Sequence, residues 1–564
     1  MSYERKPISA PRLRGAALSA VVSLANRPIA GQAVRKKMLD SIGIDELRSA
    51  PLDSEAPVPF PLHAAPSHST VGNDAPSEMA KRCVRATYPQ EGFHFTTIAD
   101  YAKAYRGLSV NPEEVARNLL AAIDRTDLEE PALRAFIACD PNDVITQAKA
   151  SAQRWSQGTP RSVLDGVPVA IKDEIDQVPY PTTVGTSFLG TGTAPADGTV
   201  VARLRAAGAL LIGKTNMHEI GLGTTGVNPH HGTARNPYNP KYATGGSSSG
   251  SAAAVAAGLC PVAVGADGGG SIRIPASFCG VVGLKPTFGR VSEYGAAPLC
   301  WSLAHIGPIG ATAADTAAAY AIMAGKDRKD PHTLIQPNID LEGFGEHHLQ
   351  GVTLGIYRPW FRDADSEVVA ICEQIIDNLR ERGALLKTIE IPDLDLARTA
   401  HLISIASEMA ASQAKNRAEH LEDYGLDVQM NLILAGELRS ADYVQAQRFR
   451  GRAIMRVLSA FSQVDAIISP ATACTAPVLS RAALNGGESN LPLIDEIIRF
   501  ATLANLTGVP AISFPAGYNS EGMPVGFQAI GKPWSETMLL QIAHVAEQFI
   551  SRREPLRHSK ILPQ

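Results

Sequence analysis

Cysteine is scarce in this chain of 564 residues. The seven cysteines are scattered, odd in number and free of any Cys-x-x-Cys pair, so the sequence suggests neither a disulfide framework nor a structural zinc site. They are Cys83, Cys139, Cys260, Cys279, Cys300, Cys372 and Cys474. A reducing compartment fits this usage best, and we therefore expect a cytoplasmic protein.

Long hydrophobic runs are also lacking. No stretch approaches the roughly 18 apolar residues of a membrane span, so we expect a soluble or peripheral protein. The nearest candidate is residues 16–25, which basic residues flank on both sides. A signal-peptide core, an interfacial helix with peripheral membrane contact and a helix packed on the domain all remain open for this segment.

A basic surface is missing as well. The formal net charge is −4 at pH 7, and the body of the chain has no long basic stripe. The sequence therefore argues against nucleic acid as a partner.

Glycine and proline, by contrast, are abundant, with 48 and 39 residues, and indicate many tight connections. A helix, a glycine and a short strand follow one another at residues 200–212 and again at 368–391, which predicts an α/β domain with a sheet covered on both sides. Further strands are expected at 167–171, 261–265, 466–469 and 511–514, and a closing helix at 536–550.

A proline-rich stretch at residues 51–76 predicts a strap or linker. The globular body begins near Phe95, and Asn111 with Pro112 predicts the start of a helix. We therefore divide the chain into an N-terminal helical extension with its strap, residues 1–94, and a catalytic domain, residues 95–564.

Two familiar patterns are misleading here. Residues 208–215 match the phosphate-loop pattern G-x-x-x-x-G-K-[ST], but a helix precedes them and residues 209–212 read as a buried strand. Ser248 lies in a G-x-S-x-G pattern, yet Pro237 and Pro240 disfavour the strand that must precede a nucleophile elbow. Both interpretations are therefore disfavoured.

A metal site is not indicated either. His218 is followed by a glutamate, but the position four residues further on is Leu222 and so offers no second ligand. We expect neither a metal nor an organic cofactor.

Two glycine-rich serine clusters carry the chemistry. Residues 245–251 read Gly-Gly-Ser-Ser-Ser-Gly-Ser, and residues 267–273 read Asp-Gly-Gly-Gly-Ser-Ile-Arg. Glycine permits tight turns, and the second cluster can point successive N–H groups at one spot, as an oxyanion hole beside a nucleophile requires. Lys172, at the end of the alternating run 166–172, is the best-placed base.

These clusters, together with residues 283–287, resemble the amidase signature family. Lys172 precedes Ser247 by 75 positions and Ser247 precedes Ser271 by 24, which are the intervals of that family. Over residues 10–550 the chain is similar to the plant-type fatty acid amide hydrolases within it. Ser249 replaces a glycine that many other members carry.

The resemblance implies the amidase-signature fold, a large twisted mixed β-sheet covered by helices on both faces. It also implies roles for three residues: Ser271 as the nucleophile, Ser247 as a bridging hydroxyl and Lys172 as the base, with a cis peptide between Gly246 and Ser247. A serine hydroxyl must lose its proton as it attacks, and lysine accepts a proton only when neutral. The chemistry therefore requires a buried, uncharged Lys172.

Further roles follow from the same resemblance. The oxyanion donors are expected to be the N–H groups of Gly268, Gly269, Gly270 and Ser271. Ser248, Asp267 and Arg273 are expected to support them. The wall of an acyl channel is expected to include Gly221, Thr472 and Cys474.

The expected activity is hydrolysis of fatty acid amides, such as N-acylethanolamines, to a fatty acid and an amine through an acyl-Ser271 intermediate. The resemblance also suggests a homodimer. The alternatives are an amidase of short or aryl amides on the same scaffold and a glutamine-amidase subunit of a transfer-RNA amidotransferase. A binding module that kept the scaffold is disfavoured by the intact triad.

Overall fold

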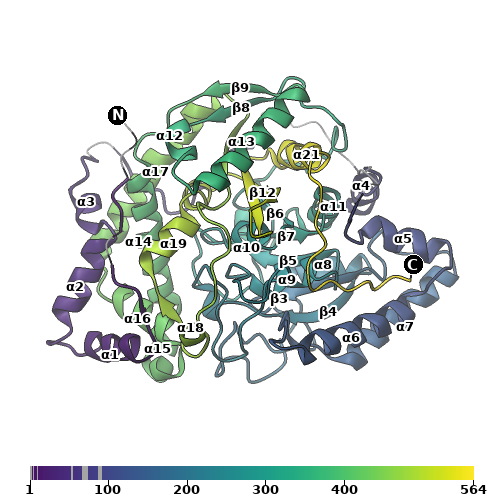
Figure 1. The fold of residues 1–564 in the computed structure, drawn as a ribbon, viewed down its shortest axis with the longest axis horizontal. Helices are drawn as coiled ribbons and strands as arrows, with labels where there is room; N and C mark the ends of the chain where they lie inside the picture. Colours follow the sequence, from purple (N-terminus) through teal and green to yellow (C-terminus); the bar gives the residue numbers. More distant parts are fainter. Residues whose placement is uncertain are drawn as a thin grey trace.

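The computed structural model describes residues 3, 5–8, 10–52, 55–65, 74–86 and 92–563. Within these residues the core is an 11-stranded mixed sheet (Figure 1). From edge to edge its strands are β2 (Phe136–Ala138), β4 (Leu210–Thr215), β3 (Pro168–Lys172), β5 (Val262–Ala266), β7 (Ile306–Gly310), β6 (Val282–Lys285), β12 (Ala511–Tyr518), β13 (Pro524–Gly531), β10 (Ala466–Pro470), β8 (Thr353–Ile356) and β9 (Leu385–Thr388). The predicted α/β class is confirmed.

The sheet is parallel at two places and antiparallel elsewhere. Strand β3 runs parallel to both β4 and β5, and β8 runs parallel to both β10 and β9. The pairs from β5 through β7, β6, β12 and β13 to β10 are antiparallel, as is the β2–β4 pair. A separate two-stranded sheet joins β1 (Leu13–Arg14) to β11 (Glu488–Ser489).

Helices flank the large sheet. Those that pack directly on it are α7 (Pro141–Ser156), α8 (Thr199–Ala206), α9 (Ser249–Ala256), α10 (Arg273–Phe278), α11 (Ala313–Met323), α12 (Arg358–Phe361), α13 (Ser366–Glu381) and α21 (Glu536–Glu547). Helices α4 (Pro76–Cys83), α5 (Ile98–Arg106) and α6 (Pro112–Leu128) extend this layer, with α4 on α11 and α6 on α7.

A second group of helices lies at one end of the sheet (Figure 1). It contains α14 (Leu394–Ser412), α15 (Ala414–His420), α16 (Leu426–Ala435), α17 (Ser440–Phe461), α18 (Arg481–Leu484), α19 (Leu491–Ile498) and α20 (Thr502–Thr507). Short 3-10 turns are η1 (Glu219–Gly221), η2 (Pro331–Ile335) and η3 (Leu421–Asp423). Helix α14 packs on α16, α17 and α20, so it connects this group internally.

Local sequence signals explain several of these elements. Asn111 caps α6 by accepting hydrogen bonds from the N–H groups of Glu113 and Glu114, and the Glu114 side chain accepts in return from the Asn111 N–H. Strand β4 is buried along its whole length, as the predicted strand at 209–212 requires. A Cβ at Gly213 would overlap the Ala138 carbonyl oxygen, so glycine permits the approach of β2.

The N-terminal segment packs on the second helical group. Helix α1 (Gly15–Ala25) buries Leu18, Val22 and Ala25 against α16, and α3 (Ile44–Ser49) packs on α14 and α17; α2 (Gln32–Ser41) lies between them along the chain. Helix packing is therefore the arrangement that the structure gives for residues 16–25. Within the described residues, no helix combines the length and apolar character needed to cross a membrane.

The predicted strap is irregular where it is described. Residues 55–65 form no helix or strand, while 53–54 and 66–73 lie outside the described residues. Arg450 donates to the Pro59 carbonyl at 2.6 Å, and His63 donates from Nε2 to the Thr507 carbonyl at 2.8 Å. These contacts fasten the strap to α17 and to the end of α20.

Candidate active site

Two neighbouring parallel strands bring the base and the second serine cluster together. Lys172 is the last residue of β3, and the turn containing Ser271 follows β5. Because β3 and β5 run parallel in register, their carboxyl ends lie at the same edge of the sheet. Ser247 lies just before α9, which packs on both strands.

All three predicted catalytic residues line one cavity of about 460 Å³. Lys172 is 1% exposed, and its side-chain nitrogen Nζ lies 2.8 Å from Ser247 Oγ and 3.4 Å from the Ala266 carbonyl oxygen. Glu174 Oε2 lies 3.1 Å from the same nitrogen. Lys172 therefore touches the predicted bridging hydroxyl and also has a carboxylate neighbour.

The first serine cluster has the expected backbone form. The peptide between Gly246 and Ser247 is cis. The Ser248 N–H donates to the Ser271 carbonyl at 3.3 Å, and this bond ties the two clusters together. Among the described residues, Ser271 Oγ forms no hydrogen bond, so the predicted contact between the Ser247 and Ser271 hydroxyls is not made in this structure.

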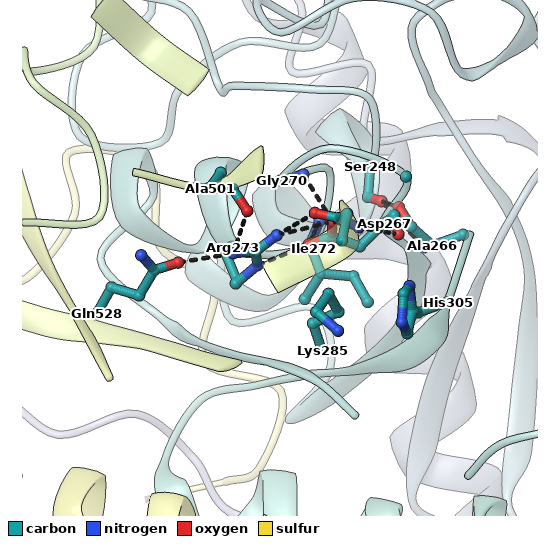
Figure 2. Close-up of polar contacts among 12 residues, drawn as sticks. Ser248, Ala266, Asp267, Gly270, Ile272, Arg273, Lys285, His305, Ala501 and Gln528 are labelled. Carbon is teal, nitrogen blue, oxygen red and sulfur yellow. Dashed lines mark hydrogen bonds and ion pairs between the residues drawn. The ribbon is translucent and has the colours of Figure 1, made fainter. Parts of the chain in front are cut away.

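Asp267 organises the second cluster (Figure 2). Its carboxylate accepts from the N–H groups of Gly270 at 2.6 Å and Ile272 at 3.2 Å, and from Arg273 Nε and Nη2 at 3.0 and 3.1 Å. Ser248 Oγ is bonded to both the N–H and the carbonyl of Ala266, next to Asp267. The three expected supporting residues thus surround the turn.

Arg273 is the cation paired with this buried carboxylate. Burial opposes the charge of Asp267, but Arg273 holds the pKa of that carboxyl well below its usual range. Burial lowers the pKa values of the nearby Lys285 and His305 well below their ordinary ones, and Arg273 adds to this effect. The Asp267–Arg273 pair is therefore the charged centre of the turn.

The expectation for the Gly270 N–H needs correction. That group donates to Asp267 and so is not directed at the cavity, and Gly270 does not line the cavity, whereas Gly268, Gly269 and Ser271 do. Gly270 has φ +118°, and a Cβ there would lie 2.5 Å from Ile274 Cδ1. Its role in the structure is to let the turn fold back on Asp267.

The turn has contacts that sequence reasoning missed. Asn505 Nδ2 donates to the Asp267 carbonyl at 2.8 Å and its Oδ1 accepts from Arg273 at 2.6 Å, and Gln528 Oε1 accepts from Arg273 at 2.7 Å. His401 Nε2 donates to the Gly268 carbonyl at 2.7 Å. No sequence signal singled out Asn505, Gln528 or His401.

The cavity has an apolar side and a polar side. Leu402, Ile405, Leu491, Ile494 and Ile498 contribute apolar side chains, whereas Glu174, Glu293, Lys329, Asp330 and His332 contribute polar ones. Gly221 lines the cavity as expected. Its φ of +78° and the 3.2 Å between its would-be Cβ and Glu174 Oε2 explain why glycine stands there.

Two expected wall residues are not part of the cavity. Thr472 donates its hydroxyl to the Cys474 carbonyl at 2.7 Å. Cys474 belongs to an apolar cluster that also contains Leu402, Ile494 and Ile498 of the cavity wall, but it does not itself line the cavity. Their expected place in the wall of an acyl channel therefore stays a prediction, since neither residue lines the cavity around Ser271.

Comparison with known proteins identifies the family of this chain. A family model described as Amidase matches residues 117–540. The chain belongs to the amidase family. The fatty acid amide hydrolase of Arabidopsis thaliana is 37% identical over 574 residues, which cover 97% of this chain and 94% of the relative. This amidase is an amide hydrolase that carries the amidase signature, and the predicted family is confirmed.

Two other relatives show the breadth of the family. One component of the glutamyl-tRNA(Gln) amidotransferase of Methylococcus capsulatus is 35% identical over 481 residues, which cover 81% of this amidase and 97% of that component. The structure of a bacterial aryl acylamidase of the amidase signature family has a TM-score of 0.73 at 27% identity, and the match covers 81% of this chain and 96% of that one.

Proposed function

We propose that this amidase cleaves fatty acid amides, such as N-acylethanolamines, to a fatty acid and an amine. The observation that carries the proposal is the cavity itself, in which Lys172, Ser247 and Ser271 meet a wall of leucine and isoleucine side chains. Apolar surface of this kind suits an acyl chain, because its burial contributes about 0.8 kcal/mol per CH₂ group. The similarity to the plant fatty acid amide hydrolase over nearly the full length also supports it.

In the proposed first step, neutral Lys172 draws a proton from Ser247, which takes the proton of Ser271. Ser271 Oγ then attacks the amide carbonyl and forms a bond to its carbon. The oxyanion receives hydrogen bonds from the N–H groups of Gly268, Gly269 and Ser271, each worth about 2.7–4 kcal/mol of barrier in comparable sites. Substrate binding would bring the Ser247 and Ser271 hydroxyls into contact, since catalytic hydrogen bonds often tighten only in the complex.

In the second step the carbon–nitrogen bond breaks. Lys172 returns the proton through Ser247 to the leaving nitrogen, because an unprotonated amide nitrogen is a poor leaving group. A neutral amine departs and leaves an acyl ester on Ser271. Water then attacks this ester by the same proton route, which releases the fatty acid and restores Ser271.

A chain-length series tests the substrate class. We expect kcat/KM for N-oleoylethanolamine to exceed that for N-decanoylethanolamine, and that for N-acetylethanolamine to be lowest, because a longer chain buries more of the apolar wall. Ser271→Ala, which removes the attacking oxygen, is the matched inactive control. An N-acetyl substrate that performs as well as the N-oleoyl one would contradict the fatty-amide assignment.

An amidase of aryl amides is the second candidate, supported by the similarity to an aryl acylamidase structure. It predicts faster hydrolysis of an acetylated arylamine than of N-oleoylethanolamine. A glutamine-amidase subunit, supported by the similarity to an amidotransferase component, predicts glutamine hydrolysis that depends on partner chains. Assays of the purified chain on the acetylated arylamine and N-oleoylethanolamine separate the first two candidates, and glutamine hydrolysis measured with and without partner chains tests the third.

We also propose that residues 1–94 are an extension of the catalytic domain at 95–564 and that the protein is a homodimer with peripheral membrane contact. The plant relative matches 97% of the chain, whereas the amidotransferase component matches 81%, which supports an extension shared with the plant branch. Ile29 is 85% exposed just after α1, so an apolar side chain is available for lipid. Sedimentation with liposomes before and after Ile29→Ser tests the membrane contact.

A further inference from the structure

The contact between Lys172 and Glu174 lies at the centre of the proposed proton route. Lys172 Nζ has three oxygen neighbours: Ser247 Oγ at 2.8 Å, Glu174 Oε2 at 3.1 Å and the Ala266 carbonyl at 3.4 Å. These three oxygens surround the nitrogen and fix its direction. The reaction needs the neutral amine. Glu174 therefore contacts the amine on which the proposed proton transfer from Ser247 depends.

The position of Glu174 is fixed by its surroundings. Its backbone carbonyl accepts from the Ala297 N–H at 2.8 Å, and the neighbouring Ile175 N–H donates to the Lys172 carbonyl at 3.1 Å. Glu174 is 8% exposed and lines the catalytic cavity. A Cβ at Gly221 would approach Glu174 Oε2 to 3.2 Å and Ser247 Oγ to 3.8 Å, so the glycine leaves room for both groups.

The acidic groups that face Glu174 come from several elements. Glu293 and Asp330 line the same cavity, and Glu408 on α14 lies close enough to influence Glu293. Burial, followed by the charges of Asp330, Glu174 and Glu408, raises the pKa of Glu293 well above its ordinary value. Lys172 is the cation that Glu174 contacts directly.

Four other charged or titratable groups lie near Glu174. Lys329 and His332 stand on the polar wall of the cavity. Lys214 lies behind the site and pairs with Asp173 at 3.5 Å. The Cys300 thiol, whose pKa burial raises well above the ordinary value, also lines the cavity.

We propose that Glu174 is a positioning residue that holds the Lys172 amine on Ser247 and acts through its charge on the proton route. The inference rests on the proposed function, in which Lys172 deprotonates Ser271 through Ser247. A carboxylate oxygen 3.1 Å from the nitrogen attracts it and keeps it 2.8 Å from Ser247 Oγ, so loss of that charge should alter proton transfer through the amine. Glu174 therefore orients the base.

The pH dependence of Ser271 labelling by a fluorophosphonate tests this role. Labelling uses the same proton route but does not depend on which amide is the substrate. We expect the acidic limb of the labelling rate to move to lower pH by about one unit or more in Glu174→Gln, since one pH unit corresponds to about 1.4 kcal/mol of charge interaction. Glu174→Asp, which retains a carboxylate, should keep its limb near that of the native enzyme.

Glu293→Gln is the matched control, because Glu293 is a carboxyl in the same cavity without a contact to Lys172. The acidic limb of the labelling rate in Glu293→Gln should move by less than about a third of the shift seen for Glu174→Gln. If Glu174→Gln fails to fold, Glu174→Asn carries the same test. An unmoved limb in the folded neutral variant, with Ser271 still labelled, would overturn the role of Glu174.

The proposed function fails in a different way. If Ser271 of the native protein is not labelled, or if Ser271→Ala still hydrolyses amides, the proton route itself is wrong. A shifted limb in Glu174→Gln together with labelled Ser271 supports both statements.

Discussion

His401 Nε2 donates a hydrogen bond of 2.7 Å to the carbonyl oxygen of Gly268. This bond connects α14, more than one hundred residues further along the chain, to the turn that carries the nucleophile. Burial lowers the pKa of His401 to about 4, so the imidazole is neutral at ordinary pH and carries its proton on the nitrogen that donates. The same helix contributes Leu402 and Ile405 to the apolar wall. The acyl side of the cavity and the oxyanion turn are therefore joined by one helix.

Loss of the His401 donor should slow catalysis. We expect His401→Leu to lower kcat about tenfold with little change in KM, because one hydrogen bond that orients the turn is worth about 1–1.5 kcal/mol. His401→Gln, which retains a donor, should recover part of the loss. Steady-state kinetics on N-oleoylethanolamine provide the measurement, and a change confined to KM would argue that His401 only shapes the acyl wall.

A methyl group at Gly269 should be far more harmful than one at Gly268. The Cβ of Gly269→Ala would lie 2.8 Å from His401 Cε1, whereas that of Gly268→Ala meets its nearest atom, Cys300 Sγ, at 3.1 Å. Displacement of an oxyanion donor typically costs about 10²–10³ in kcat. We expect such a loss for Gly269→Ala and less than about tenfold for Gly268→Ala in the same assay; equal losses would count against this packing argument.

Removal of the Asp267 charge should destabilise the whole domain. Asp267→Asn leaves Arg273 buried without its carboxylate, which we expect to lower the free energy of unfolding by at least about 3 kcal/mol. The control is Asp377→Asn, since the Asp377–Arg380 pair lies on the surface and should contribute little. Urea denaturation measures both. A stable Asp267→Asn protein would show that Asn505 and Gln528 suffice to hold Arg273.

Asp315 should make the free energy of unfolding depend on pH, and this effect does not involve the active site. Burial raises its pKa from 3.8 to about 7, while Thr312 and the Ile98 N–H donate to it. Because its pKa is raised in the folded state, Asp315 stabilises the fold in its protonated form. This stabilisation is fully present below about pH 4 and is lost as the pH rises through about 7.

Asp315→Asn should remove this effect. Relative to the variant, the native protein should lose stability between about pH 5 and pH 8, which urea midpoints at the two pH values will measure. Asp124→Asn, at an exposed site, is the control for the loss of one carboxylate. A constant difference between the native protein and Asp315→Asn would rule out a shifted Asp315.

Local patterns predicted much of this structure. The Asn111 cap, the buried strand at 209–212 and the strands ending near Lys172 and Ala266 are encoded by residues adjacent in sequence. The pairing of Lys172 with Ser247 followed from spacing and resemblance, and the structure places them 2.8 Å apart.

Contacts from distant parts of the chain were not predictable. His401 reaches the turn from a helix without any motif, and Glu174 contacts Lys172 because the chain turns back after β3. The Gly270 N–H was expected in the oxyanion hole, but the direction of an N–H depends on the turn that Asp267 imposes. Thr472 and Cys474 do not line the catalytic cavity, and no local pattern identifies which residues form its wall, since that depends on packing.

The acyl-enzyme tests the central claim most directly. The enzyme is mixed with N-oleoylethanolamine, quenched in acid within the first turnovers, digested and examined by mass spectrometry. The account predicts an oleoyl group on the peptide containing Ser271 in the native protein, and none in Lys172→Ala or Ser271→Ala. Steady turnover by Ser271→Ala, or an oleoyl group on any other residue, would contradict it.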